Sequence, residues 1–204
     1  VDAPVATIAN ALGIAWRWDN DTPAVYLYDR AHQIMEENSI SGHLQVYPLG
    51  DDYYYYYDMG TTYIRKGLKY QDKNSFPVTV PALRKEGYAV SDQFGVPLME
   101  FIDLDRDGQK QELLVMYYLS PENREEAPAA YEVHVLRRVD ERTLEDVGTL
   151  LNGKEAIRFH YQPEIGLLFA TFYDPLFQPN RIEVFQWKQG RMEAVDTFVK
   201  AGGE

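Results

Sequence analysis

A run of aspartates at alternate positions is the feature of this sequence with the most specific chemistry. Asp103, Asp105 and Asp107 stand at loop positions one, three and five, and Gly108 follows at position six. This spacing turns three carboxylates toward one centre, and the glycine permits a sharp turn after which the backbone carbonyl of Gln109 faces the same point. Because three carboxylates in one turn repel one another without a cation, the pattern predicts a site for calcium, which prefers oxygen ligands.

Two neighbouring residues compete to close this loop. An EF-hand has a glutamate at position twelve, but Leu114 stands there and the flanking residues have strand composition, which excludes an EF-hand. Gln111 at position nine could offer its amide oxygen, or Glu112 could reach in through a bulged strand. The predicted metal ligands are Asp103, Asp105, Asp107, Gln109 and Glu112.

Residues 101–116 resemble the short strand–loop–strand calcium loop of FG-GAP and VCBS-type repeats. They are also similar to the Asp-x-Asp-x-Asp-Gly … Glu-Leu segment of exported bacterial lipoproteins of unassigned function. The resemblance implies a structural calcium site and an exported or lipid-anchored bacterial protein, with any anchor upstream of Val1. Extracellular calcium loops often bind at about 10⁻⁴–10⁻³ M, which suits an extracellular or envelope location. Without an ion, the stretch would be an acidic turn whose charges are offset by Arg106 and Lys110.

Five consecutive tyrosines form the most unusual composition in the chain. On a strand, Tyr53, Tyr55 and Tyr57 share one face, and Tyr54 and Tyr56 share the other. One face would then be core and the other an exposed aromatic platform for a carbohydrate or peptide. The alternative is a two-sided strand in which tyrosine packs on both faces.

Sequence motifs for catalysis are missing. The chain has no cysteine, and its four histidines lack the spacing of a zinc hydrolase. No nucleophile elbow, P-loop or dinucleotide fingerprint occurs either. Any catalytic pair of acids would have to be assembled by the fold from 32 candidates.

Composition narrows the class of protein. The 204 residues are 45% hydrophobic and carry a net charge of −12, which is typical of a globular chain and disfavours nucleic-acid binding. No apolar run approaches the roughly 18 residues of a transmembrane helix. The length predicts one domain over residues 1–204, or two packed subdomains with a boundary near 89–97.

The pattern of apolar residues predicts an α+β fold, with an N-terminal helix packed on a mainly antiparallel, strand-rich meander. Thr22 would cap the helix, Pro23 would begin it, and apolar residues recur at helical spacing as far as Met35. Alternation around Trp16 favours a strand before it. Thirteen later segments have strand composition: 44–48, 53–58, 61–65, 76–80, 87–90, 98–103, 112–119, 131–139, 143–150, 156–161, 167–173, 181–188 and 191–199.

These features together predict a non-catalytic extracellular or envelope-associated binding module with a structural calcium-type site. The alternative is a secreted hydrolase acting on polysaccharide or peptide, which should show paired carboxylates with shifted pKa values in a deep pocket. A third reading, a structural subunit of a larger assembly, predicts an exposed apolar patch. The oligomeric state is left open by the sequence.

Overall fold

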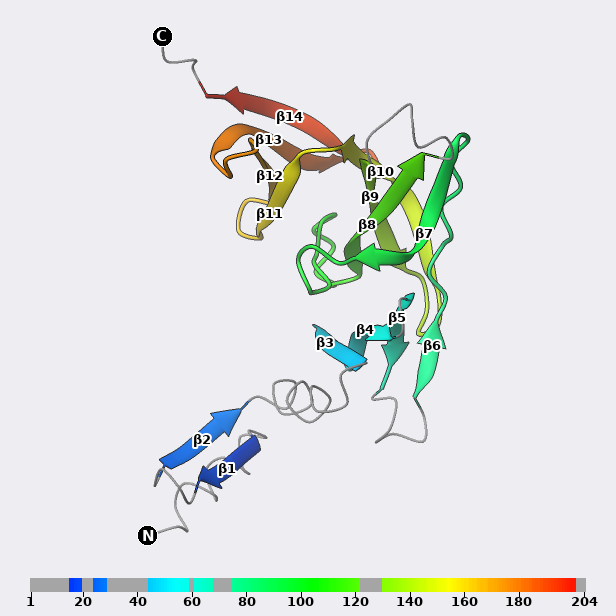
Figure 1. Cartoon of the computed structure of the whole chain (residues 1–204), viewed down its shortest axis with the longest axis vertical. Coiled ribbons are helices and arrows are strands. Elements are labelled where there is room, and N and C mark those ends of the chain that lie inside the picture. The colour runs from blue at the N-terminus through cyan, green and yellow to red at the C-terminus, as the bar shows by residue number, and fades with distance from the viewer. Residues whose placement is uncertain are drawn as a thin grey trace.

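The computed structural model describes residues 15–19, 24–28, 44–58, 61–67, 75–121 and 130–200. Within these ranges the chain forms four antiparallel sheets and no helix (Figure 1). The expected antiparallel meander is confirmed, but the α+β class is wrong, because the described chain is all-β. No helix in this part of the chain is long and apolar enough to cross a membrane.

The strands follow one another within each sheet, so that neighbours in sequence are neighbours in space. A two-stranded sheet contains β1 (Ala15–Asp19) and β2 (Ala24–Tyr28). The first four-stranded sheet contains β3 (Leu44–Gly50), β4 (Tyr53–Asp58), β5 (Thr61–Lys66) and β6 (Phe76–Val78). The second contains β7 (Tyr88–Gly95), β8 (Glu112–Pro121), β9 (Ala130–Arg138) and β10 (Leu144–Gly153). The third contains β11 (Ala156–Gln162), β12 (Leu167–Tyr173), β13 (Pro179–Lys188) and β14 (Arg191–Val199).

The predicted N-terminal helix is wrong wherever the structure describes its residues. The segment Ala24–Tyr28 is strand β2, which pairs with β1 from Ala24 to Tyr28 without a register shift. Its sequence, AVYLY, contains one β-branched and two aromatic residues, which favour a pleated strand, so strand pairing overrides the helical spacing. The strand expected near Trp16 is confirmed as β1. The rest of the predicted helix, Pro23 and residues 29–35, lies outside the described residues.

The strand expected over 98–103 is also wrong. These residues form turns and bends, and only Ile102 makes an isolated bridge, to Glu112. The Met99 amide donates to the Val96 carbonyl at 3.1 Å, and Met99 itself has a φ of 53°, which breaks the extended backbone. The apolar residues that predict a strand here are buried from a turn instead. Phe101 packs into one core and Ile102 into another.

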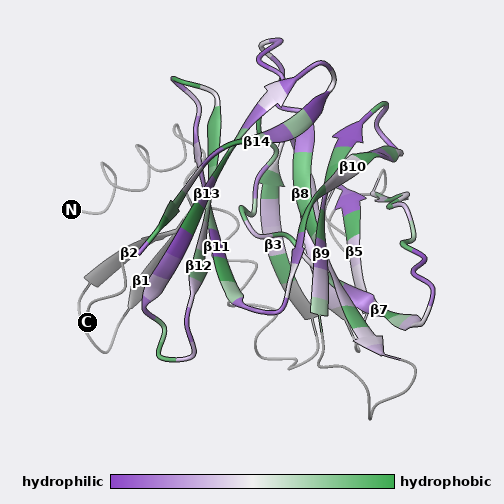
Figure 2. Cartoon of the chain, turned by 90° about the horizontal axis from the view of Figure 1, so that it is seen from above, coloured by the Kyte–Doolittle hydropathy of each residue, from purple (hydrophilic) through white to green (hydrophobic). Residues whose placement is uncertain are grey.

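Two hydrophobic cores flank the sheet β7–β10. The first joins Leu113 of β8 and Leu136 of β9 with Ile64 and other residues of β3–β6. The second joins Leu114 and residues of β9 with Phe172 and others of β11–β14. Side chains alternate between the faces of a strand, so β8 sends consecutive buried residues into opposite cores. Bands of hydrophobic and hydrophilic residues accordingly alternate along the strands (Figure 2).

The last hairpin has a tight two-residue turn. Gln189 and Gly190 connect β13 and β14 with φ values of 49° and 86°. Two consecutive residues with positive φ are the signature of the tight hairpin turn whose twist matches the flanking strands. The predicted boundary near 89–97 falls mainly within β7, and the division of the chain into domains stays a prediction.

Candidate metal centre and ligand groove

The connection between β7 and β8 brings three acids together. One oxygen from each of Asp103, Asp105 and Glu112 lies within 4.8 Å of the others. Glu112 is the first residue of β8 and is fully buried. Its backbone exchanges hydrogen bonds of 2.8 and 3.0 Å with Ile102, which fixes the glutamate beneath the aspartate loop. The cluster of acids is therefore closed by Glu112.

The other predicted ligands lie differently. The Asp107 carboxylate accepts hydrogen bonds from the Gln109 amide at 2.8 Å and from Gln111 Nε2 at 3.3 Å, within its own turn. Asp107 is not among the acids that meet at the cluster. Gln111 directs its amide nitrogen to Asp107, so of the two residues that could close the loop, Glu112 is the one in the cluster. Gln109 is exposed.

Backbone amides of the loop partly neutralise the cluster. Gly108 has a φ of 91°, the left-handed conformation that its lack of a Cβ permits, and its amide donates to Asp103 Oδ2 at 3.0 Å. The Asp107 amide donates to Asp105 Oδ1 at 3.2 Å. The role expected for the glycine, a sharp turn that folds the loop onto its first aspartate, is visible in these bonds.

An arginine that the sequence did not single out completes the cluster. Arg137 of β9 donates from Nε to Glu112 at 3.0 Å and from Nη2 to Asp105 at 2.7 Å. Its guanidinium also lies over the Trp187 ring, 5.0 Å from the centroid. Of the two expected counter-charges, Lys110 pairs with Glu100 at the surface.

The register of the sheet explains why Arg137 was missed. Glu112 and Arg137 are directly opposite each other on β8 and β9. An opposite-charge pair across neighbouring strands is a recognisable signal, but only when the register is known. Residues 122–129, which separate the two strands, contain no turn signature that fixes it.

The cluster retains negative charge. Three carboxylates and one guanidinium leave a net charge of −2, and Asp103 Oδ1 is buried without a hydrogen-bond partner. Burial raises the pKa of Glu112 above its ordinary value, against the opposing effects of the Leu104 amide and of Arg137. Oxygen ligands, a charge of −2 and an unsatisfied carboxylate oxygen together fit one divalent cation held by Asp103, Asp105 and Glu112.

Two hydrogen bonds connect the aspartate loop to neighbouring sheets. The Phe101 amide donates to the Leu49 carbonyl of β3 at 3.0 Å. The Tyr161 hydroxyl of β11 donates to the backbone carbonyl of Asp103. The position of the loop is thus tied to β3 on one side and to β11 on the other.

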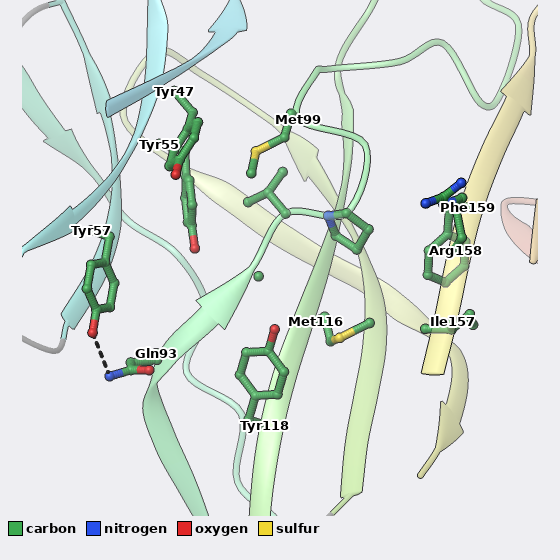
Figure 3. Close-up of a pocket in the computed structure, with 13 residues that line it drawn as sticks. Tyr47, Tyr55, Tyr57, Gln93, Met99, Met116, Tyr118, Ile157, Arg158 and Phe159 are labelled. Carbon is green, nitrogen blue, oxygen red and sulfur yellow. Dashed lines mark hydrogen bonds between the residues drawn. The ribbon is translucent and has the colours of Figure 1, made fainter. Parts of the chain in front are cut away.

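The same connection forms part of a groove of about 580 Å³ between the sheets. In Figure 3, three tyrosines of β3 and β4 lie on one side, and Ile157, Arg158 and Phe159 of β11 lie on the other. Tyr118 and Met116 of β8 lie between them, and Met99 comes from the β7–β8 connection. The three tyrosines are Tyr47, Tyr55 and Tyr57.

The groove offers aromatic faces and a few polar groups. Tyr118 is 45% exposed. Tyr57 accepts a hydrogen bond from Gln93 Nε2 at 3.3 Å, and Tyr55 donates to the Phe94 carbonyl at 2.6 Å. Burial raises the pKa of Tyr55 to about 12, so this hydroxyl stays protonated near neutral pH. Arg158 is the single charged residue of the lining.

The tyrosine run on β4 packs on both faces. Tyr53 and Tyr55 belong to the first core, whereas Tyr56 is buried on the opposite face against Val46. Of the two alternatives that the sequence left open, the two-sided strand is therefore confirmed, and Tyr55 and Tyr57 contribute to a groove instead of an exposed platform.

The most buried histidine of the described chain is engaged by carboxylates on both sides. His134 Nδ1 lies 2.8 Å from Asp146 Oδ2, and Nε2 lies 3.4 Å from Glu132 Oε2. Burial raises the pKa of Glu132, but hydrogen bonds from Lys85 and His134 outweigh it and hold the pKa below its ordinary value. Although Thr149 also lies 3.4 Å from Nε2, a carboxylate shares that nitrogen, so the arrangement is a satisfied core network rather than a nucleophile and its base.

Comparison of the chain with protein-family models, curated proteins and solved structures gave no match.

Proposed function

We propose that this chain is a non-catalytic binding module, in which a calcium-type loop supports a tyrosine-lined groove for a carbohydrate. The observation that carries the proposal is the lining of the groove. It contains four tyrosines but no acid, histidine, serine or threonine among its thirteen residues. A surface with this composition can hold a ligand, and it lacks the carboxylates, imidazoles and aliphatic hydroxyls that most often serve as nucleophile, general acid or general base.

The chemistry of the groove suits a sugar chain. A sugar ring presents an apolar face of C–H groups, which stacks on aromatic side chains, and an edge of hydroxyls, which need hydrogen-bond partners. Tyr118 and Tyr57 would supply stacking faces, while Gln93 and Arg158 would supply donors. Because the chain carries a net charge of −12, a neutral glycan is favoured over a polyanionic one.

A peptide is the second candidate ligand. Strand β11 lies at the edge of its sheet, and three of its residues line the groove. An extended peptide could add a strand at such an edge through backbone hydrogen bonds. The tyrosine-rich opposite wall favours a carbohydrate, but binding of peptides belongs in the same experiment.

The proposed role of the cation is structural. The loop that holds Asp103 and Asp105 also contributes Met99 to the groove, so a bound cation would fix one part of the groove wall. Calcium is proposed because the donors are all carboxylate oxygens, the hard ligands that this cation prefers. An affinity of about 10⁻⁴–10⁻³ M would fill the site outside cells, in keeping with an extracellular or envelope-associated protein.

The alternative of a secreted hydrolase has less support. A glycosidase needs two carboxyl groups about 5–10 Å apart on either side of the scissile bond, and the groove lining contains none. The acids that do meet, Asp103, Asp105 and Glu112, are held by Arg137 and by backbone amides rather than facing the groove lining.

The groove predicts a specific loss of binding when its exposed tyrosine is removed. We expect the chain to bind one or more neutral oligosaccharides in a panel measured by isothermal titration calorimetry. Removal of the Tyr118 ring by Tyr118→Ala should weaken binding about tenfold, or by about 1.4 kcal/mol, because the stacking face is lost. Arg158→Ala should weaken binding as well, through loss of its donors.

Tyr88→Ala is the matched control, because Tyr88 is a partly exposed tyrosine of β7 that does not line the groove. This variant should bind like the wild-type chain. Binding of extended peptides but of no oligosaccharide in the panel would replace the carbohydrate with a peptide. Equal affinity in the Tyr118 and Tyr88 variants would place the ligand outside this groove and refute the proposal.

A further inference from the structure

The connection between β12 and β13 exposes two large apolar side chains at its tip. Leu176 is 78% exposed and Phe177 is 77% exposed, more than any other large hydrophobic residue of the described chain. They are adjacent in sequence, in the segment Asp174-Pro175-Leu176-Phe177-Gln178-Pro179. Neither residue belongs to either core.

The tip is held in one conformation by a single aspartate. Asp174 Oδ1 accepts hydrogen bonds from the Leu176 and Gln178 amides, at 2.8 and 2.9 Å. The Asp174 amide donates to the Gln178 carbonyl, and the Phe177 amide donates to the Asp174 carbonyl, both at 2.9 Å. Two flanking prolines restrict the backbone further. The exposed side chains are therefore presented by an ordered turn.

Phe177 combines an unfavourable backbone conformation with an exposed apolar ring. Its φ is 57°, in the left-handed region that glycine and asparagine adopt with less strain. A bulky apolar residue there costs backbone strain and exposes a ring to water, and no intramolecular packing in either core compensates. Backbone strain of this kind clusters at functional sites, which favours a contact between the Phe177 ring and a partner outside the molecule.

Further apolar residues lie beside the tip. The end of β14 carries Phe198 and Val199, both largely exposed, and Val199 pairs with Arg181 two residues beyond Pro179. Lys200 Nζ donates to Gln178 Oε1 at 3.2 Å, so an ammonium group adjoins the tip. The exposed Leu176 and Phe177 side chains thus have an ammonium group beside them at one end of the sheet β11–β14.

We infer that the tip of Leu176 and Phe177 inserts into the interface of a lipid bilayer. The tip has two large apolar side chains, whereas a stable protein–protein interface buries about 800 Å² on each partner, from about 20 to 30 residues. Two projecting side chains need a complementary pocket to bind a protein, but they enter a fluid interface without one. This inference is independent of the groove and of its ligand.

The charge of the chain specifies the kind of bilayer. With a net charge of −12, the protein is repelled by an anionic surface, and one lysine beside the tip does not reverse this. The expected surface is zwitterionic, and binding is weak and reversible because only two side chains insert deeply.

Flotation of the full chain with phosphatidylcholine vesicles tests the inference. The wild-type chain should float with the vesicles. The partition coefficient of the double variant Leu176→Ser/Phe177→Ser should be at least about tenfold lower, because two large apolar side chains no longer insert. Ile165→Ser is the matched control, because Ile165 is 50% exposed at the opposite end of β12. A Phe177→Trp variant should keep binding and show a blue shift of tryptophan emission on vesicles, whereas Ile165→Trp should show none.

Three results would overturn the inference. The first is a wild-type chain that does not float with phosphatidylcholine vesicles. The second is equal flotation of the wild-type chain and the double variant. The third is a double variant that changes only the oligomeric state, which would make the tip a protein interface. Unchanged circular dichroism and melting temperature of the variants would show that each result concerns the tip rather than folding.

Discussion

Replacing Arg137 by leucine should lower the free energy of unfolding by about 3–5 kcal/mol in the presence of a chelator. This is the usual cost of removing one partner of a buried ion pair, because the remaining charge has no compensation. Arg137 is the shared donor to Glu112 and Asp105, and Glu112 has no exposed surface. Urea unfolding of the wild-type and Arg137→Leu chains measures the loss.

Calcium should restore part of this stability. In the Arg137→Leu variant the three carboxylates no longer have a guanidinium between them, so a divalent cation is the remaining source of positive charge at the cluster. Millimolar calcium should therefore stabilise the variant more than it stabilises the wild-type chain. Arg191→Leu is the control, because Arg191 pairs with Glu193 at the surface and its loss should cost at most about 1 kcal/mol. An Arg137→Leu variant that calcium leaves unchanged would contradict a cation at this cluster.

Leu104→Ala should lower the free energy of unfolding by about 2–5 kcal/mol, the range for buried leucines in well-packed cores. Leu104 stands between two of the clustered aspartates, but its side chain is fully buried in the second core. Its amide also donates to Glu112 Oε2 at 2.9 Å. The substitution leaves a cavity beneath the loop, so calcium affinity should fall together with stability.

Leu176→Ala provides the comparison for this prediction. It removes the same atoms from a residue that is almost fully exposed, and the expected change is within about 0.5 kcal/mol. The two variants are compared by urea unfolding under identical conditions. Equal effects would mean that Leu104 does not anchor the loop in the core.

The strands were largely predictable from the sequence because local composition decides them. Runs such as 112–119 and 191–199 are rich in β-branched and aromatic residues, and turn residues separate them. The same local reasoning failed at Ala24–Tyr28, where apolar residues at helical spacing form a strand with a neighbouring strand as partner. It failed again at 98–103, where apolar residues fill two cores from a turn.

The candidate sites depend on tertiary placement to different degrees. The three clustered acids lie within ten residues, so the sequence motif indicates Asp103, Asp105 and Glu112 together. The motif does not indicate that the Asp107 carboxylate bonds within its own turn instead. Arg137 depends on strand register, which a long connection conceals. The groove combines residues from Tyr47 to Phe159, and no local pattern marks side chains that meet across three sheets.

Titration of calcium into the chelator-treated chain, followed by isothermal titration calorimetry, tests most directly whether a cation holds the β7–β8 loop. We expect one site with a dissociation constant of about 10⁻⁴–10⁻³ M. Asp103→Asn should abolish binding, because this carboxylate belongs to the cluster, whereas Asp107→Asn should retain it. If the wild-type chain binds no calcium and its melting temperature is the same in chelator and in millimolar calcium, Arg137 and the backbone amides hold the acids together without a cation, and the cation-held loop is refuted.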